Sequence, residues 1–275
     1  MTSQFPPGFS IETLQDKSIH FVGIGGCGMS GLALLIARLG ANVQGTDEIE
    51  SKTTSKLMRE GIEVSFTQDG STIPTNTDLI VHSAAIVPDH PEIIAGDEMG
   101  IPIVTYAQML GLVQRKHTSV CIAGTHGKST TVSILSSILL HTNFNPSFIV
   151  GANCEQIGGS SKVGSSTIPV GTHRGEQGIL ISESCEFNRS FHDHNPKIGL
   201  INNIEEDHLD YYSSLDDIIK SFKGFAMKIP DSKDGGVLLI AHDGAHRNIV
   251  TPALSCNVET FGFHPEADYQ VMFDP

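Results

Sequence analysis

The residues with the clearest chemical potential form one segment, Gly124-Thr125-His126-Gly127-Lys128-Ser129-Thr130. An apolar run precedes this segment and a helix-like run follows it. A strand that leads through glycines into a helix directs successive backbone N–H groups at one point, and that arrangement suits a phosphate. Lys128 adds a point charge for β- and γ-phosphates, and the Ser129 hydroxyl stands where Mg²⁺ would bind. The segment therefore predicts a loop that binds the phosphates of ATP.

Two features of this segment leave alternatives open. Ala123 stands one place off the first glycine of the general P-loop pattern, so the segment also fits a plain strand-to-helix turn with an incidental lysine. His126 either contacts a phosphate or fills the turn.

A carboxylate and a histidine follow two later strand-like runs. Glu183 ends the run 178–183, and His208 comes shortly after the run 198–204. In a parallel sheet both would project at the same edge as Lys128, and Ser129, Glu183 and His208 could then hold Mg²⁺. The alternatives are that Glu183 caps a helix or pairs with a lysine, and that His208 is simply solvated. Its acidic neighbours are interpreted as a solvated turn: Glu205, Glu206, Asp207 and Asp210.

A second glycine motif, G-x-G-x-x-G, lies at Gly23, Gly25 and Gly28 between a short apolar run and a helix-like run. Asp47 ends the following run, at about the distance expected for a carboxylate that binds a ribose. This βαβ pattern predicts a site for the diphosphate of a nucleotide. NAD or FAD specifically, or a purely structural glycine turn, are the alternatives.

These residues must be positioned by alternating strands and helices. Strand-like runs recur along the chain at 20–24, 42–47, 62–64, 78–83, 101–104, 119–123, 147–151, 178–183, 198–204 and 236–240. Such alternation predicts an α/β protein with parallel sheets and ligands at the carboxyl ends of the strands. We predict a Rossmann-like, doubly wound domain at 1–116, followed by an incomplete P-loop-type α/β domain at 117–275 that binds ATP.

Smaller elements are predicted with the same rules. They are a helical turn at 11–14, a mobile hairpin within the Gly/Ser-rich stretch 158–175, a helix at 215–227 and a strand that begins at 267–273. A terminal strand with no element after it leaves an open sheet edge. We therefore expect the protein to continue past this chain.

Bulk properties exclude several classes of protein. The 275 residues are 39% apolar and carry a formal net charge of −14, which repels nucleic acid and anionic membranes. The five cysteines lack any C-x-x-C pair, which argues against a disulfide framework and against a zinc site. No apolar run approaches the roughly 18 residues that a membrane span needs. We expect a cytoplasmic protein, and no feature indicates an oligomeric state.

Four motifs in this order resemble the Mur ligases of peptidoglycan assembly. They are residues 20–31 (HFVGIGGCGMSG), 83–86 (SAAI), 124–130 (GTHGKST) and 202–210 (NNIEEDHLD). The resemblance spans nearly all of residues 18–270. It implies an ATP-dependent amide ligase: ATP phosphorylates the lactyl carboxylate of UDP-N-acetylmuramate, and the amine of L-alanine attacks the acyl phosphate.

The resemblance also implies roles for individual residues. Lys128, Glu183 and His208 would be catalytic, Lys128 bracing the transferred phosphoryl group. Mg²⁺ would be held by Ser129, Glu183 and His208. The UDP-sugar, in place of NAD, would be bound by Gly25, Gly26, Cys27, Gly28, Met29, Ser30, Asp47 and Ser83.

Three departures from the family pattern limit these expectations. The acidic stretch after Glu183 reads Ser184-Cys185-Glu186-Phe187-Asn188, so no ligand role is assigned beyond Glu183. The family's paired serines appear as Ser83-Ala84, and the family's third domain lies beyond this chain. Three other functions stay open: a family member that attaches a whole tripeptide to UDP-N-acetylmuramate, a dinucleotide-dependent oxidoreductase, and a nucleotide-binding remnant without catalytic activity.

Overall fold

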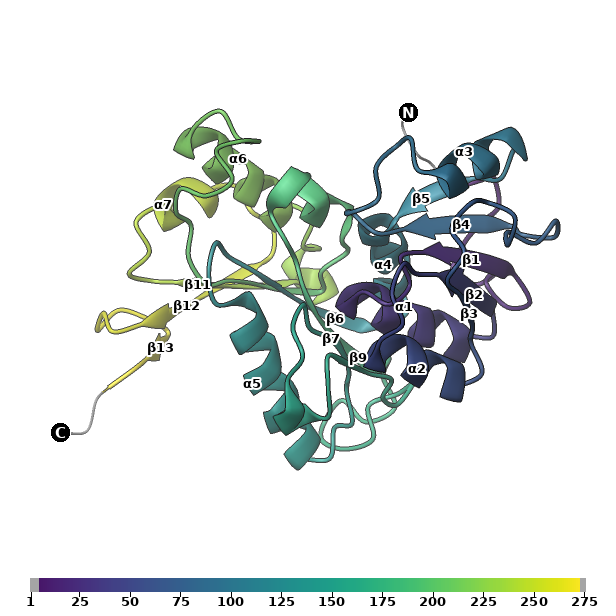
Figure 1. Ribbon diagram of the computed structural model, residues 1–275. Helices are drawn as coiled ribbons and strands as arrows, with labels where there is room; N and C mark the ends of the chain where they lie inside the picture. The colour runs from purple at the N-terminus through teal and green to yellow at the C-terminus, as the bar shows by residue number, and fades with distance from the viewer. Residues whose placement is uncertain (1–4, 273–275) are drawn as a thin grey trace. The chain divides into compact units, whose positions relative to one another are not determined.

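The structure is a computed structural model that describes residues 5–272 (Figure 1). The chain forms two compact units. One contains the residues up to Lys116 together with Phe148–Val163, and the other contains His117–Ser147 with the residues from Gly164 onward. Within the described residues, no helix is both long and apolar enough to cross a membrane.

The first unit is built on a parallel sheet of five strands in the order β3-β2-β1-β4-β5. This order starts at a central strand and winds outward in both directions, so the predicted doubly wound fold is confirmed. Helix α1 packs against α2 and α4. The elements are β1 (Ser18–Val22), α1 (Cys27–Arg38), β2 (Asn42–Thr46), α2 (Lys52–Arg59), β3 (Glu63–Ser65), β4 (Leu79–His82), α3 (Pro91–Glu98), β5 (Ile103–Thr105) and α4 (Tyr106–Gln114).

The second unit is also an α/β structure, with strands in the order β13-β12-β11-β10-β6-β9 and parallel pairing throughout. Strand β6 carries the predicted phosphate loop at its carboxyl end. The elements are β6 (Thr118–Ala123), α5 (Lys128–His141), β9 (Ile179–Glu183), η2 (Phe187–Asp193), β10 (Ile198–Ile201), α6 (Leu215–Ala226), η3 (Ser232–Asp234), β11 (Val237–Ala241), α7 (Arg247–Val250), β12 (Asn257–Gly262) and β13 (Tyr269–Gln270).

Helix α6 shows why the local sequence folds as it does. The Ser214 hydroxyl caps the helix by accepting the backbone N–H of Asp217, and Ile218, Phe222 and Phe225 are buried on one side. Apolar residues at helical spacing thus turn one face of α6 into the core of the second unit.

Three smaller expectations changed. Residues 11–14 form a turn and no helix. In the Gly/Ser-rich stretch, β8 (Ser161–Lys162) pairs antiparallel with β7 (Ser147–Ile149), and the short helix η1 (Glu155–Ile157) lies between them. A Cβ on Gly31 would lie 2.7 Å from the Ser161 Cβ, so this hairpin packs directly against α1 of the first unit. The expected strand at 267–273 is shorter, and residues 273–275 lie outside the described chain.

Candidate nucleotide-binding loops

The phosphate-type loop joins β6 to α5 through two glycines in left-handed conformations. Gly124 has a φ of 144° and Gly127 a φ of 81°. A Cβ on Gly124 would also lie 2.9 Å from the Cβ of Asn202, so both its backbone angles and its close neighbour require glycine. The loop therefore turns tightly at the carboxyl end of β6, immediately before the first residue of α5, Lys128.

Two asparagines after β10 hold this loop in place. The Asn203 side chain accepts the backbone N–H of His126 at 2.8 Å, and its backbone carbonyl accepts the N–H of Thr125 at 3.2 Å. The Asn202 amide donates to the His126 carbonyl at 3.2 Å and to the Thr131 hydroxyl at 3.1 Å. Asn202 and Asn203 were expected only as parts of a family motif. Their position directly after a strand at the same sheet edge was the signal for this role.

The two helices that follow glycine loops differ from the others in how they begin. Side chains accept backbone N–H groups at the starts of α2, α3, α4 and α6. Among described helices of eight residues or more, only α1 and α5 lack such a side-chain cap, their N-cap residues being Gly26 and Gly127. The first N–H groups of a helix have no partner within it, and with the helix dipole they favour an anion. Each unit thus offers one helix start suited to phosphate.

Lys128 is held by the loop and by a carboxylate that was assigned no role from the sequence. Its Nζ donates to the Gly124 carbonyl at 2.5 Å and to the Thr125 carbonyl at 3.1 Å. It also pairs with both oxygens of Glu186, at 2.8 and 3.1 Å. The Lys128 side chain is 15% exposed and that of Glu186 only 2%. The Lys128 ammonium next to the loop is therefore neutralised by the Glu186 carboxylate.

The segment that presents Glu186 has an unusual backbone. Asn188 and Arg189 both adopt left-handed conformations, with φ near 53° and 54°. The Tyr212 hydroxyl donates to the Glu186 carbonyl, and Arg189 pairs with Asp217 at 2.7 Å. Non-glycine residues in this region cost conformational energy and persist only where surrounding contacts fix them. The chain therefore turns sharply just after Glu186, whose carboxylate contacts Lys128 and whose carbonyl is held by Tyr212.

His208 lies next to Glu186. Its Nε2 is 4.0 Å from a Glu186 oxygen and 3.9 Å from an oxygen of Asp207, and its φ of 51° is also left-handed. One donor atom from each of these three residues lies within 4.8 Å of the others. A set with two carboxylates suits a hard cation such as Mg²⁺. Asp207 was interpreted as solvated, and the structure places it in this cluster.

The other predicted residues of this site lie at the same sheet edge. Glu183 ends β9 in register with Ile122 of β6, and Ser129 is the second residue of α5. Glu183 does not belong to the three-residue cluster around His208. The exposed His126 ring lies 4.0 Å from Glu205, and the backbone N–H of His126 donates to the Asn203 side chain. The predicted ligand set Ser129, Glu183 and His208 therefore stays a prediction.

At the first glycine loop, in the first unit, the ends of three strands lie close together. The Gly25 N–H donates to an Asp47 carboxylate oxygen at 2.7 Å, which brings the end of β2 to the loop after β1. Ser83, after β4, donates its backbone N–H to the Val22 carbonyl and lies beside Gly23. Within the predicted set, Met29 and Ser30 are buried, and Cys27 is half-buried. Asp47 and Ser83 thus flank the loop, and their role in binding a UDP-sugar stays a prediction.

A buried polar network supports this loop from behind. Glu92 of α3 is fully buried, and its two oxygens lie 3.0 Å from His20 Nε2 and 2.6 Å from the Thr46 hydroxyl, which donates. Gln68 donates to the Thr46 hydroxyl at 3.2 Å, and Gln44 lies 3.3 Å from His20 Nδ1. Since the Glu92 carboxylate, the His20 ring and the Thr46 hydroxyl all have partners, the network fixes the end of β2 from which Asp47 extends.

Comparison with known proteins decides the family. Residues 18–118 match the model described as "Mur ligase family, catalytic domain", and residues 122–273 match the Mur ligase middle domain. The chain belongs to the Mur ligase family. The two glycine loops described above each fall within one of the two Mur ligase matches.

Among relatives, the chain is 37% identical over 262 residues to a UDP-N-acetylmuramate–L-alanine ligase of Alkaliphilus metalliredigens, covering 95% of this chain and 54% of that protein. It is 39% identical over 258 residues to the ligase of that name from Lachnospira eligens, covering 94% and 53%. This Mur ligase chain therefore spans about half the length of the curated relatives it matches.

Among solved structures, one of a UDP-N-acetylmuramate:L-alanyl-gamma-D-glutamyl-meso-diaminopimelate ligase from Neisseria meningitides superposes with a TM-score of 0.77 at 26% identity. That alignment covers 90% of this chain and 78% of the other. The superposition agrees with the Mur ligase fold of both units.

Proposed function

We propose that this chain is the UDP-sugar-binding and ATP-binding part of a ligase that joins L-alanine to the lactyl carboxylate of UDP-N-acetylmuramate. The observation that carries the proposal is the pair of uncapped helix starts, α1 and α5, each placed after a glycine loop and one in each unit. Two anionic ligands, a UDP-sugar and ATP, need two such sites. The names of relatives at 37% and 39% identity supply the substrate class.

In this proposal the N–H groups at the start of α5 and the Lys128 ammonium hold the phosphates of ATP. The carboxylate of UDP-N-acetylmuramate attacks the γ-phosphorus, ADP leaves, and the amine of L-alanine then displaces phosphate from the acyl phosphate to form the amide. Such reactions depend on positioning and charge neutralisation more than on covalent help from the protein. Lys128 supplies part of that charge, and the N–H groups of the loop supply orientation.

Oxygen-rich side chains near Lys128 fit Mg²⁺, the second cofactor of the proposal. Ser129, Glu183 and His208 would hold the ion, and the adjacent carboxylates of Glu186 and Asp207 add further oxygen donors. When bound, Mg²⁺ would neutralise phosphate charge during transfer. Lys128 is paired with Glu186, so in this proposal the Lys128 ammonium is shared between that carboxylate and the phosphates of ATP.

The proposal is tested by separating the two sites with one variant each. Thermal stabilisation of the chain is measured with UDP-N-acetylmuramate, with ATP and Mg²⁺, and with NAD. Lys128→Met should abolish the response to ATP and leave that to UDP-N-acetylmuramate. Gly25→Ala should do the reverse, because its Cβ would lie 2.8 Å from Asp47 and Thr54. Stabilisation by NAD alone would favour the oxidoreductase, and equal loss of both responses in either variant would contradict two separate sites.

The tripeptide-attaching ligase is the second candidate, because the Neisseria meningitides structure of that name matches 90% of this chain. The two functions differ in the amine. With the full-length protein, ADP release from ATP and UDP-N-acetylmuramate should depend on L-alanine. Dependence on L-alanyl-γ-D-glutamyl-meso-diaminopimelate, with no response to L-alanine, would establish the alternative.

A further inference from the structure

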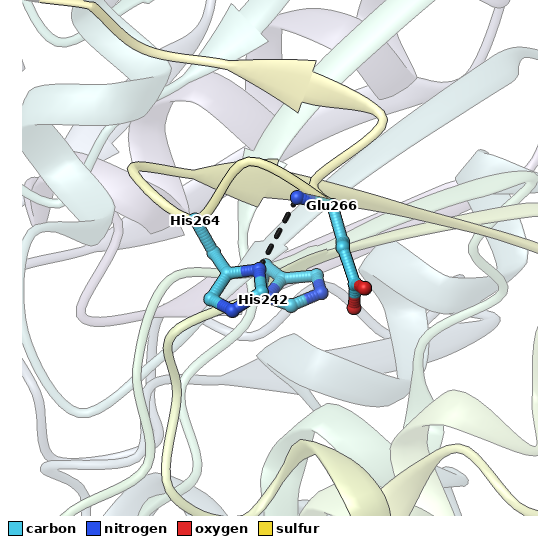
Figure 2. Close-up of side chains that lie close together, drawn as sticks. All are labelled: His242, His264 and Glu266. Carbon is cyan, nitrogen blue, oxygen red and sulfur yellow. Dashed lines mark hydrogen bonds between the residues drawn. The ribbon is translucent and has the colours of Figure 1, made fainter.

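A second cluster of donor side chains lies in the second unit and takes no part in the site around Lys128. His242 directly follows β11, and His264 and Glu266 lie on the turn after β12. One donor atom from each lies within 4.8 Å of the other two. Figure 2 shows the two imidazole rings side by side, with the Glu266 side chain reaching toward the same space. His242 is half-buried, and the other two residues are exposed.

The backbone fixes the two segments that carry these donors. The His242 N–H donates to the Phe261 carbonyl at 2.7 Å, and the Phe263 N–H donates to an Asp243 carboxylate oxygen at 2.7 Å. Gly262, between them, has a φ of 157°, and a Cβ there would lie 2.1 Å from the same Asp243 oxygen. The close approach of the turn to the end of β11 therefore depends on glycine. The donors are brought together by the fold, and not by the chance positions of long side chains.

We propose that His242, His264 and Glu266 form a binding site for one divalent transition-metal ion of the zinc type. Two imidazoles and one carboxylate, with remaining positions left to water, are a donor set that Zn²⁺ accepts. Nitrogen donors favour Zn²⁺ and neighbouring transition metals over Mg²⁺, which prefers oxygen. The site would therefore select a different ion from the one proposed for the ATP site. The cysteine count gave no indication of it, because no cysteine takes part.

The hydrogen bonding of His264 shows which nitrogen is available. The backbone N–H of Glu266 donates to His264 Nδ1 at 3.2 Å, so this nitrogen carries a lone pair and no proton (Figure 2). Figure 2 also shows this nitrogen on the side of the ring that faces His242. A bond of 3.2 Å is at the long end of the normal range. A metal ion can take over this lone pair in exchange for one weak hydrogen bond and with no loss of a proton from His264.

Binding requires a local adjustment of the side chains. Donors of a tetrahedral Zn²⁺ site lie about 3.4 Å apart, which follows from metal–ligand distances of about 2.1 Å. The rings now stack with centroids 4.5 Å apart and planes 16° from parallel. Parallel rings direct their lone pairs side by side, so one ring must rotate for both to point at the same ion. Since His264 and Glu266 are exposed, that rotation meets little packing resistance.

The consequence for the fold is a clamp between two strand ends. The ion would join the segment after β11 to the turn after β12, adding to the hydrogen bonds and the ring stacking that now connect them. A ligand that binds the folded state and not the unfolded state stabilises it in proportion to the logarithm of its concentration over Kd. The melting temperature of the second unit should therefore rise with Zn²⁺ in the presence of saturating Mg²⁺.

The test is Zn²⁺ binding by isothermal titration calorimetry, with excess Mg²⁺ present. The expected result is one Zn²⁺ per chain, and an affinity at least about tenfold weaker in each of His242→Ala, His264→Ala and Glu266→Gln. His173→Ala is the matched control, because His173 and Glu176 form an exposed pair at 3.0 Å that belongs to no three-donor group among the described residues. It should bind Zn²⁺ as the parent chain does. Circular dichroism confirms that each variant is folded.

Three outcomes would overturn the proposal. One is binding of Zn²⁺ that weakens as much in His173→Ala as in His264→Ala, which would indicate non-specific binding by surface histidines. Another is loss of binding in His208→Ala with His264→Ala unaffected, which would place Zn²⁺ in the cluster around Glu186. The last is displacement of Zn²⁺ by millimolar Mg²⁺, which would indicate an oxygen-donor site. Co²⁺ absorption in the visible range gives an independent readout, and its intensity should fall in His242→Ala.

Discussion

The ion pair beneath the phosphate loop provides a quantitative test of the structure. Lys128→Met removes the cation that faces Glu186, whose side chain is 2% exposed. His208 also lies near this carboxylate, with its Nε2 4.0 Å away. Leaving a buried carboxylate without its partner typically costs about 3–5 kcal/mol. Because Lys128 itself is 15% exposed and water can partly replace it, we expect the free energy of unfolding to fall by about 3 kcal/mol.

Substitution of the other partner, Glu186, should lower the free energy of unfolding by less. Glu186→Gln leaves Lys128 with two carbonyl acceptors, Gly124 and Thr125, so we expect a loss of about 1 kcal/mol. The double variant has no unpaired charge and should lose only about 2 kcal/mol, which gives a coupling energy of about 2 kcal/mol. Urea unfolding followed by circular dichroism measures all four proteins. The absence of tryptophan makes circular dichroism preferable to fluorescence.

The exposed pair Lys17–Asp78 provides the control for this cycle. Its atoms are 2.9 Å apart, close to the Lys128–Glu186 distance, but its side chains are 37% and 34% exposed. An exposed pair contributes about 0.2–1 kcal/mol. If the two Lys128 and Glu186 substitutions were additive within about 0.5 kcal/mol, or coupled no more strongly than the control pair, the buried ion pair would not exist in solution.

The remaining predictions concern other buried groups. Burial lowers the pKa of His194 to about 4, whereas the unfolded chain takes up this proton near 6.5, so the free energy of unfolding should fall by about 3 kcal/mol as the pH drops from 7 to 4. In His194→Asn, urea titrations at several pH values should show that the free energy of unfolding has lost this part of its pH dependence. A pH dependence equal to that of the parent chain would assign the loss of stability to other groups. Gly124→Ala should lower the free energy of unfolding by more than the 1–2 kcal/mol or so expected for Gly61→Ala, because both have positive φ but only Gly124 meets a neighbour. Glu92→Ala should cost about 3 kcal/mol in thermal unfolding by leaving buried hydroxyl and imidazole groups unpartnered, and an unchanged melting temperature would contradict the network.

The sheet architecture could be predicted because the spacing of apolar residues and the positions of turn-forming residues are local features of the sequence. Apolar runs such as 119–123, which ends at Gly124, predict parallel strands with helices between them, and the structure confirms this α/β class. The packing of Phe148–Val163 with the first unit could not be predicted in the same way. It depends on the fit of Ser161 against Gly31, a contact between positions far apart in sequence whose composition indicates only a surface loop.

The candidate site likewise has one part that could be predicted from local sequence and one part that could not. Lys128 and the loop glycines could be found from their spacing, because a strand, a turn and a helix specify that geometry locally. Glu186 could not, since its approach to Lys128 depends on two consecutive left-handed residues, Asn188 and Arg189, that no local rule predicts. The same holds for the imidazole cluster: His242 and His264 become neighbours only because Gly262 lets the turn approach β11.

Charge explains why both loops rely on backbone groups. The chain carries a formal net charge of −14, so its long-range field opposes a diphosphate and a triphosphate alike. N–H groups at a helix start attract an anion without adding net charge, and their effect is confined to the first turn. The only cation of the second loop, Lys128, is already compensated by Glu186, and Asp207 adds a further negative charge nearby. In the proposed function a triphosphate would therefore meet a loop with no surplus of positive charge. In the proposed function this deficit is what makes a divalent cation necessary, and the carboxylates that create the deficit are the ones placed to bind it.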